Sequence, residues 1–327
     1  MTAGAVSTEG TGWVQDRCAD LIRNVERFIH GKVAVVRDSV ICLLAEGHLL
    51  IEDVPGVAKT SLAKAIAHSI SGSMKRIQFT PDLLPSDVIG VQILEKHEQK
   101  FQFKKGPVFA HIVLGDEINR ASPKTQSALL EAMAERQVTV DGETYPLPWP
   151  NIVIATQNPI DLQGTYALPE AQLDRFMMLL RVGYPSIEHE MHIVRDAVDR
   201  MLPEQLQPVI TIDEVGKMIE IARSVKLAPP IQRYIVTIVA ATRTVKHLRL
   251  GASPRASNAL AVASQAHAVV CEGRSFVTAD DVKALARSVL SHRLLLRPEA
   301  AVHGHSADGI IQDIMDSVAV PQDPVGG

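Results

Sequence analysis

The sequence predicts an α/β fold with a parallel sheet, followed by a second region made of helices alone. Between residues 49 and 182, short apolar runs typical of strands alternate with helical patterns, as in a parallel sheet covered by helices. After Gly183-Tyr184-Pro185 the strand patterns end, and helical patterns follow one another to about Leu296. A chain of 327 residues is long enough for two domains, each with its own core.

Two helices are expected before the first strand. Apolar residues between Leu21 and Ile29 recur at helical spacing and stop at Gly31, and a second helix over about 38–45 stops at Gly47. Five parallel strands are then expected at Leu49–Ile51, Lys75–Phe79, Ile112–Leu114, Ile152–Ala155 and Met177–Val182. The helices between them are expected at about 60–70, 125–135 and 170–175.

Two segments interrupt this alternation. Residues 82–109 contain several Pro and Gly residues around two short strand-like runs, 88–94 and 100–103, which indicates an ordered insert beside the sheet. Residues 138–145 contain Asp141-Gly142 between β-prone arms. This dipeptide suits a two-residue hairpin turn, because both central positions of such a turn need positive φ. We therefore expect a hairpin there.

The helical region has recognisable helix starts. Thr211 with Glu214 and Thr278 with Asp281 have the spacing of capping boxes. Ser253-Pro254 supplies a cap and a first-turn proline to a helix that is expected to stop at Gly273. These signals predict successive, separate helices in the second region.

Composition narrows the classes of function. Lys and Arg number 33 against 37 Asp and Glu, and the net charge of -4 gives no global attraction to nucleic acid or to an anionic membrane. The three cysteines are widely spaced without a CxxC pair, so we expect neither a disulfide framework nor a zinc site. No signal peptide or membrane-spanning apolar run is evident. We expect a cytoplasmic protein without membrane insertion.

The segment Asp53-Val54-Pro55-Gly56-Val57-Ala58-Lys59-Thr60-Ser61 lies between a predicted strand and a predicted helix. Phosphate oxygens bind to backbone N–H groups at a helix N-terminus together with a cation. Here Gly56 allows close backbone approach, Lys59 can reach terminal phosphates, and the Thr60 hydroxyl can hold Mg²⁺. The match to GxxxxGK[ST] is incomplete, because Asp53 and Ala58 replace two glycines. A simple Pro-Gly turn is the alternative.

Asp116-Glu117 follow an apolar strand directly, which places both carboxylates at the carboxyl edge of the sheet, where open α/β sheets bind ligands. We expect Asp116 to hold Mg²⁺, through water, and Glu117 to orient and polarise an attacking water. Solvated surface carboxylates are the alternative. The acidic pair gains its significance from its combination with the phosphate-binding segment.

Three further polar residues are candidates for the site. Asn158 follows a predicted strand and can hold the water or the γ-phosphate, although Asn-Pro is also an ordinary turn start. Arg255 lies in the first turn of a helix, where a cation opposes the macrodipole unless an anion such as a phosphate lies nearby; a solvated position is the alternative. Arg175 ends a helix, where the dipole favours a cation, so a structural role is by itself an adequate explanation of this residue.

The motifs from about Gly47 to Arg287 together resemble the MoxR family of AAA+ ATPases. The matching phrases are Leu50-Ile-Glu-Asp-Val-Pro-Gly-Val-Ala-Lys-Thr60, Asp116-Glu-Ile-Asn-Arg-Ala121, residues 126–140, Ala155-Thr-Gln-Asn-Pro159, Leu168-Pro-Glu-Ala-Gln-Leu-Asp-Arg-Phe176 and Gly251-Ala-Ser-Pro-Arg255. Each phrase is modestly specific, but their order and spacing form a strong match.

The resemblance implies an AAA+ core, with a helix-2 insert and a pre-sensor hairpin, followed by a helical lid. It implies a catalytic site for Mg-ATP between the subunits of a ring, usually hexameric. Lys59 and Thr60 match the Walker A pair, Asp116 and Glu117 the Walker B pair, and Asn158 sensor 1. Arg175 matches the arginine finger offered to a neighbouring subunit, and Arg255 matches sensor 2. The two interruptions of the sheet match the insert and the hairpin, which in such machines can face the pore.

The resemblance also implies partners and a domain plan. The expected activity is chaperone-like remodelling of client proteins, often ones with von Willebrand A domains, by a homo-oligomer. We expect a disordered N-terminus over 1–15, the ATP-binding domain over 16–185, a linker over 186–210, the lid over 211–300 and a partly disordered extension over 301–327.

Two other functions remain open at this level. A nucleic-acid motor related to MCM helicases would share this core and its two inserts, but the acidity of the chain and the lack of an appended DNA-binding motif make nucleic acid an unexpected partner. A regulatory scaffold that binds ATP and hardly hydrolyses it would fit the incomplete phosphate loop, but Glu117, Asn158 and the two arginines favour hydrolysis.

Overall fold

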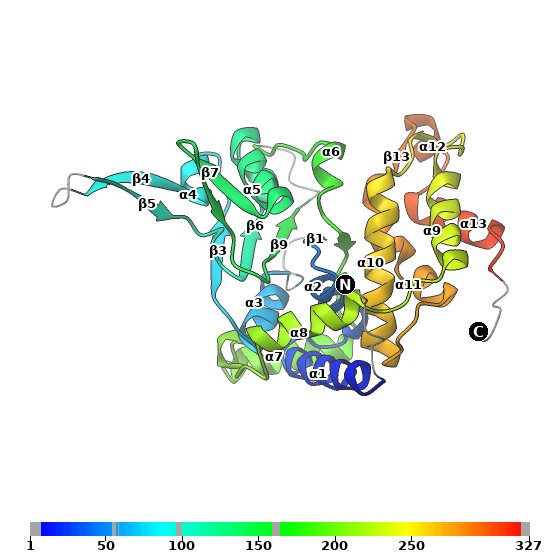
Figure 1. Cartoon of the computed structure of the whole chain (residues 1–327), viewed down its shortest axis with the longest axis horizontal. Helices are drawn as coiled ribbons and strands as arrows, with labels where there is room; N and C mark the ends of the chain where they lie inside the picture. Colours follow the sequence, from blue (N-terminus) through cyan, green and yellow to red (C-terminus); the bar gives the residue numbers. More distant parts are fainter. Residues whose placement is uncertain (1–7, 54–56, 58, 96–99, 159–163, 322–327) are drawn as a thin grey trace, which may run out of the picture.

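The computed structural model describes residues 8–53, 57, 59–95, 100–158 and 164–321 (Figure 1). A five-stranded parallel sheet forms the centre of the first domain, with the strand order β10-β1-β9-β6-β3. Its strands are β1 (Leu49–Glu52), β3 (Met74–Gln78), β6 (Ile112–Asp116), β9 (Ile152–Gln157) and β10 (Met178–Leu180). The predicted parallel sheet of five strands is therefore confirmed.

Helices cover both faces of the sheet, and successive residues of a strand pack into two separate hydrophobic cores, one on each face. Leu49 and Ile51 of β1 pack in a core with α1 (Thr8–Glu26), α2 (Val33–Leu44) and α3 (Lys59–Ser69). Leu50, between them, packs in a second core with α5 (Pro123–Glu135). Side chains alternate across a strand, so a strand buried on both faces must be apolar at every position. This explains the continuous apolar runs in the sequence.

The first helix begins earlier than expected. Residues 1–15 were expected to be disordered, but α1 begins at Thr8. Val14 is fully buried, and the Gln15 side-chain amide donates to the carbonyl of Cys271 at 3.0 Å. Cys271 belongs to α10 (Pro254–Glu272) of the helical region. Contacts with a helix distant in the sequence thus order a segment whose own composition is small and polar.

Both interruptions of the sheet form hairpins. In the insert, a short helix α4 (Pro85–Ile89) precedes β4 (Gly90–Glu95) and β5 (Lys100–Lys105), which pair antiparallel and project away from the sheet (Figure 1). The insert's first strand was expected from Val88, which lies in α4 instead. The second hairpin joins β7 (Gln137–Val140) to β8 (Glu143–Pro146), and its turn has φ of 50° at Asp141 and 85° at Gly142. The turn prediction is confirmed.

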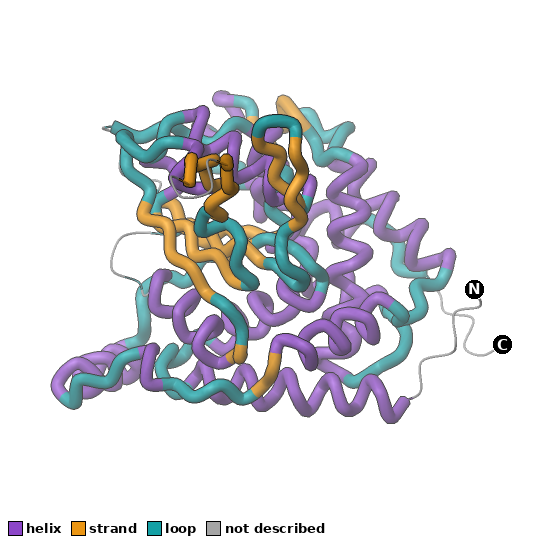
Figure 2. Tube along the Cα trace, turned by 60° about the vertical axis from the view of Figure 1, so that its left-hand side comes forward, coloured by secondary structure: helices purple, strands orange, loops and turns teal. Residues whose placement is uncertain are grey.

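The second region consists mainly of helices (Figure 2), and those from residue 229 onward lie together on one side of the molecule in Figure 1. After α6 (Glu170–Leu173) and β10, these are α7 (Ile187–Val198), α8 (Ile212–Arg223), α9 (Pro229–Thr242), α10, α11 (Ala279–Leu290), α12 (Pro298–Val302) and α13 (Ala307–Ser317). Short pairings that the sequence did not predict join β11 (Ile210–Thr211) to β2 (Ile70–Ser71) and β12 (Leu248–Leu250) to β13 (Leu295–Leu296).

The predicted helix caps are present. The Thr211 hydroxyl accepts from the backbone N–H of Glu214 at 3.2 Å, and the Thr211 N–H donates to the Glu214 carboxylate at 2.7 Å. The Thr278 N–H donates to the carboxylate of Asp281, also at 2.7 Å. The Ser253 hydroxyl accepts from the Arg255 N–H at 3.2 Å, which fixes the start of α10. The helix ends at Gly273, whose φ is +58°.

Candidate functional site

A cavity of about 940 Å³ opens at the carboxyl ends of β1, β6 and β9, within the size range of small-ligand sites. Lys59, Thr60, Asp116, Glu117 and Asn158 all line it, as do Val57 and Ser61. Parallel strands end at the same edge of a sheet, so residues distant in the sequence meet there. Val54, Pro55, Gly56 and Ala58, also expected at the site, lie outside the described residues.

The Lys59 ammonium lies at the start of α3 and links two strands of the sheet. Its Nζ donates to the carbonyl of Asp53, after β1, at 2.5 Å and to the carbonyl of Gln157, at the end of β9, at 3.1 Å. Burial lowers the pKa of Lys59, while the nearby carboxylates of Asp53 and Glu117 oppose that shift. The Asp53 carboxylate also accepts the Gly183 N–H at 2.5 Å, which ties this segment to the chain after β10.

Asp116 lies at the centre of a hydrogen-bonded cluster. One carboxylate oxygen, Oδ1, accepts the hydroxyl of Thr60 at 2.9 Å and that of Thr156 at 3.1 Å. The other, Oδ2, accepts Nε of Arg76 at 2.8 Å. Asp116 is only 3% exposed, so its charge needs these partners, because a buried charge without them is costly. The cluster holds the carboxylate beside the first turn of α3.

Glu117 has an unusual backbone. Its φ of 57° and ψ of 50° place it in the left-handed region, where side chains other than glycine are uncommon and where strain often marks functional sites. Its N–H donates to the Thr156 hydroxyl at 3.0 Å. Its carboxylate accepts from Gln78 at 3.0 Å and forms an ion pair with Arg120 at 3.2 Å. The Glu117 carboxylate thus has partners different from those of Asp116, although both residues line the cavity.

Asn158 is 7% exposed and lies just after β9. Its backbone carbonyl accepts the side-chain amide of Asn119 at 3.0 Å, which connects the end of β9 to the short helix after Glu117. Asn158 therefore lines the same cavity as the two carboxylates, at the end of the strand after which it was expected.

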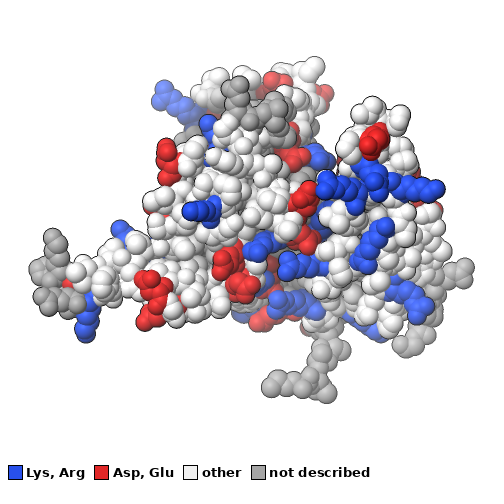
Figure 3. All heavy atoms as spheres, turned by 90° about the horizontal axis from the view of Figure 1, so that it is seen from above, with Lys and Arg blue, Asp and Glu red and all other residues white. Residues whose placement is uncertain are grey.

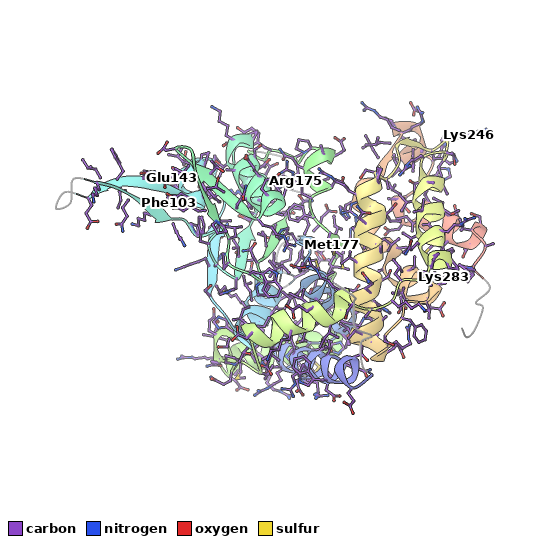
Figure 4. All side chains as sticks on the ribbon, in the orientation of Figure 1. Phe103, Glu143, Arg175, Met177, Lys246 and Lys283 are labelled. Carbon is purple, nitrogen blue, oxygen red and sulfur yellow. The ribbon has the colours of Figure 1, made fainter. Side chains whose placement is uncertain are left out.

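The two arginines do not line this cavity. The Arg175 guanidinium donates to the carbonyl of Leu130 in α5, and the residue lies beside that helix in Figure 4. Arg255 is exposed in the first turn of α10. Within the described part of the chain, no carboxylate forms an ion pair with Arg255. A single chain thus brings together the residues of the sheet edge without either arginine.

Sequence reasoning missed several residues of the cluster. Arg76 and Gln78 are two residues apart on β3 and therefore share one face of that strand. Two polar residues with this spacing on a predicted strand could have indicated a polar site on that face. Thr156 is 2% exposed within the apolar strand β9, and a hydroxyl in such a run marks a buried hydrogen bond. Arg120 had no distinguishing signal.

The other wall of the cavity is largely apolar. It comes from the turn after α1, the chain after β10 and the region around α7, namely Phe28, Ile29, Val182, Tyr184, Ile193, Met201 and Leu202. These residues carry no motif and come from segments far apart in the sequence, so the sequence did not indicate them. An apolar wall beside a cation and hydroxyl groups suits a ligand with a flat base and an anionic tail.

The donor set of the cluster also fits Mg²⁺. This ion prefers oxygen ligands, keeps several waters, and is usually held by one or two carboxylates together with substrate phosphates. The Thr60 hydroxyl and the Asp116 carboxylate are such ligands, and they lie within 2.9 Å of each other. No group of three or more His, Cys, Asp or Glu in the described residues forms a dedicated metal site. A cation here would therefore depend on phosphate oxygens as well.

Comparisons with known proteins agree with this geometry. Residues 48–178 match the model of the ATPase family associated with various cellular activities (AAA), and residues 240–314 match that of the AAA lid domain. The chain is 48% identical over 300 residues to the uncharacterized protein YeaC of Bacillus subtilis, covering 92% of this chain and 93% of that one. It is 41% identical over 312 residues to the chaperone MoxR1 of Mycobacterium tuberculosis, and the match covers 92% of this chain and 81% of that one.

A solved structure has the same fold over almost the whole chain. It is the crystal structure of a protein from Cytophaga hutchinsonii, with 37% sequence identity and a TM-score of 0.89. The match covers 96% of this chain and 98% of that one. The sheet, the phosphate-binding edge and the helical lid define an AAA+ ATPase. Within that class, the chain belongs to the MoxR family.

No helix in the described residues is both long enough and apolar enough to cross a membrane. The longest helices, α1 and α10, have 19 residues each, and both contain charged or polar side chains. They pack against each other and against α2.

Proposed function

We propose that this protein is a Mg-ATP-dependent, chaperone-like remodelling factor that matures or activates partner protein complexes. The observation that carries the proposal is the 2.9 Å contact between the Thr60 hydroxyl and the Asp116 carboxylate at the start of α3. A hydroxyl and a carboxylate meet there beside Lys59, at the edge of the sheet where phosphates bind. The similarity to a chaperone supports the remodelling role.

We assign roles within this site as follows. Residues 53–61 hold the nucleotide, with Lys59 on the terminal phosphates. Thr60 and Asp116 hold Mg²⁺, which supplies charge neutralisation between the phosphates when bound. Glu117 orients and polarises the attacking water, and Asn158 holds that water or the γ-phosphate. The cavity supports these roles because it brings all five side chains to one edge.

The two arginines complete the site from outside the cavity. Arg255 reaches the phosphates when the lid closes, and Arg175 acts on the ATP of a neighbouring subunit in a homo-oligomeric ring, which we propose to be hexameric. The position of Arg175 beside α5, away from the cavity of its own chain, supports action on a neighbour. In phosphoryl transfer such an arginine contributes about 10³ to 10⁵ in rate.

In the proposed organisation, the ATP-binding domain spans residues 16–185, the lid begins at residue 211, and residues 186–210 join the two. Helix α7 lies within that connection. The activity is placed in the cytoplasm, where ATP is available, and the clients include proteins with von Willebrand A domains.

Glu117→Gln tests the proposal. The variant keeps the shape of the side chain but removes its charge, so it should bind Mg-ATP normally and lose about 10² to 10⁴ in turnover. The measurements are nucleotide binding by titration and phosphate release at saturating ATP. Glu131→Gln, at an exposed position of α5, is the matched control and should keep the normal rate. Normal turnover in Glu117→Gln would contradict the assigned role.

The same variant tests the remodelling role. Glu117→Gln should hold ATP and retain client complexes during affinity purification, whereas Lys59→Ala, which should not hold ATP, should release them. Proteins recovered equally with both variants would contradict ATP-dependent client binding. That result would leave the ATPase assignment intact.

A further inference from the structure

Asp174 lies where the lid meets the segment that carries Arg175. It ends α6, and its carboxylate contacts two residues of the second region. Oδ1 forms an ion pair with Nε of Arg293 at 2.9 Å, and Oδ2 accepts the hydroxyl of Ser253 at 3.0 Å. Both partners lie within the stretch 240–314 that matches the AAA lid domain. One carboxylate of the core is therefore held by two separate elements of the lid.

Arg293 contacts the chain on both sides of Arg175. Its side chain is 3% exposed, and it follows α11 in a short 3-10 helix. Besides the Asp174 carboxylate, it donates to the carbonyl of Phe176 at 2.7 Å. Burial lowers the pKa of Arg293 to about 10, and Asp174 opposes that shift, so the guanidinium stays charged at neutral pH. The arginine thus clamps the residues before and after Arg175.

A neighbouring histidine adds a third contact. Nε2 of His292 lies 3.1 Å from the same carbonyl of Phe176. Burial, together with the charge of Arg293, lowers the pKa of His292 to about 3, so the ring is neutral and donates its N–H to that carbonyl. The backbone from Asp174 to Phe176 is therefore held by the end of α11 through donors fixed in the lid.

The second partner of Asp174, Ser253, also contacts Arg255. Ser253 is the N-cap of α10, and its hydroxyl also accepts the N–H of Arg255. The Asp174 carboxylate therefore contacts the cap of the helix that carries Arg255, while the next residue along the chain is Arg175. Figure 4 shows Arg175 and Met177 on the part of the core that faces α10.

We propose that Asp174 is a positioning residue that couples the lid to Arg175, so that a change in lid angle moves the arginine offered to the neighbouring subunit. This inference rests on the proposed role of Arg175. Stability alone does not require such a pair, because replacing a buried ion pair by apolar side chains of similar volume is often neutral or stabilising. We expect the Asp174–Arg293 pair to act by fixing the position of Arg175, because a displacement of about 1 Å at a reacting centre can lower the rate about a hundredfold.

The experiment compares three variants alone and in mixtures. Asp174→Asn should keep the KM for ATP within about twofold and lower kcat by about tenfold or more, because binding uses the chain's own cavity and turnover uses the neighbour's arginine. Mixed one to one with Glu117→Gln subunits, which supply intact arginines but do not turn over, Asp174→Asn should regain activity. Arg175→Ala should behave in the same way in both measurements.

The mixtures separate two kinds of failure. If Arg175→Ala is not restored by Glu117→Gln subunits, the proposed role of Arg175 fails. If Arg175→Ala is restored and Asp174→Asn either keeps the normal kcat or stays inactive in the mixture, the positioning role of Asp174 is wrong while that of Arg175 stands. A merely structural defect would not be corrected by a neighbouring subunit.

Two further variants guard against misfolding. Asp174→Asn leaves Arg293 buried without its charge partner, so Asp174→Leu combined with Arg293→Met removes both charges and should restore the melting temperature. The kcat of this double variant should remain as low as that of Asp174→Asn, and a normal kcat in the double variant would overturn the proposal. Asp308→Asn is the control, because Asp308 pairs with Arg181 across the same two domains at 3.5 Å, and also with Arg287, through neither Asp174 nor Arg293. It should turn over normally.

Discussion

The core and the lid contribute to the proposed ATP site in different ways. In the core, the side chains at the sheet edge are already joined to one another: Lys59 bridges two strand ends, and Asp116 accepts hydrogen bonds from Thr60, Thr156 and Arg76. These contacts lie within one domain and around one cavity. The core half of the site is therefore preorganised before any ligand binds.

The arginine half is not assembled in this way. Arg255 is exposed at the start of α10, and Arg175 lies beside α5. Viewed from above, most Lys and Arg side chains on that face gather over the lid, while acidic side chains lie on the core and along its boundary with the lid (Figure 3). Because both arginines lie apart from this edge, the proposed site needs a movement of the lid and a neighbouring chain for turnover, but not for nucleotide binding.

The largest expected effect comes from removing the core cation. Lys59→Ala should raise the Kd for ATP by at least about tenfold, equal to about 1.4 kcal/mol, because the ammonium both neutralises phosphate charge and joins the two strand ends. Turnover should fall to about 1% or less. Titration with a fluorescent ATP analogue and a phosphate-release assay measure the two effects.

Lys64→Ala is the matched control. Lys64 lies on the same helix and pairs with Glu204 at 2.8 Å near the surface, where such a pair contributes less than about 1 kcal/mol. Its replacement should leave ATP binding and turnover unchanged. Equal losses in both variants would mean that α3 as a whole, rather than the Lys59 ammonium, supports the site.

The core half was largely predictable from the sequence, for a simple physical reason. Parallel strands bring their carboxyl ends together, so Lys59, Asp116, Glu117 and Asn158 could each be placed at one edge from their positions after apolar runs. The five strands, the hairpin turn at Asp141-Gly142 and the capped helices followed from local patterns in the same way. Each of these predictions depended on residues close together in the sequence.

What the sequence did not predict depends on contacts between distant segments. The apolar wall of the cavity combines the turn after α1 with the chain after β10, and α1 itself packs against α10. The contact of Asp174 with Ser253 and Arg293 joins residues 79 and 119 positions apart, and the sequence marks Ser253 only as a helix cap and gives Arg293 no role. Local spacing carries no information on such pairs.

The next effect in size tests the lid half. Arg255→Ala should lower kcat by about tenfold while ATP affinity changes by no more than about threefold, because in the proposed site the arginine meets the phosphates only when the lid closes. The measurement is the rate of phosphate release at saturating ATP, together with ATP titration. This split between kcat and affinity is the opposite of that expected for Lys59→Ala, where binding itself is lost.

Arg249→Ala provides the comparison for this variant. Arg249 is an exposed arginine of the same domain, in β12 shortly before α10, so it tests whether any basic residue on the lid surface would serve. It should keep the normal kcat. If the two variants lose the same activity, the general charge of the lid matters rather than Arg255, and the contrast between the two halves of the site weakens.

The smallest expected effect concerns the rigidity of the lid. Nδ1 of His267 in α10 lies 2.7 Å from the Asp281 carboxylate in α11, which also pairs with Arg274 at 2.8 Å. Burial lowers the pKa of His267, but hydrogen bonds to Asp281 and Cys271 outweigh it and raise the pKa to about 9. Burial raises the pKa of Asp281, but its bonds from His267 and Arg274 bring it down to about 2. The pair is therefore charged at neutral pH.

This charge makes lid stability depend on pH in a defined direction. Because the pKa of His267 is higher in the folded protein, its contribution is fully present below about pH 6.5 and is lost as the pH rises through about 9. Allowing for screening by solvent, we expect a loss of roughly 1 kcal/mol, seen as a fall of a few degrees in the melting temperature between pH 6.5 and 9. His267→Gln should show a smaller fall, and His303→Gln, at an exposed histidine, the normal one. Equal slopes in all three proteins would mean that α10 and α11 are not held together by this pair, and that Arg255 is not presented by a rigid lid.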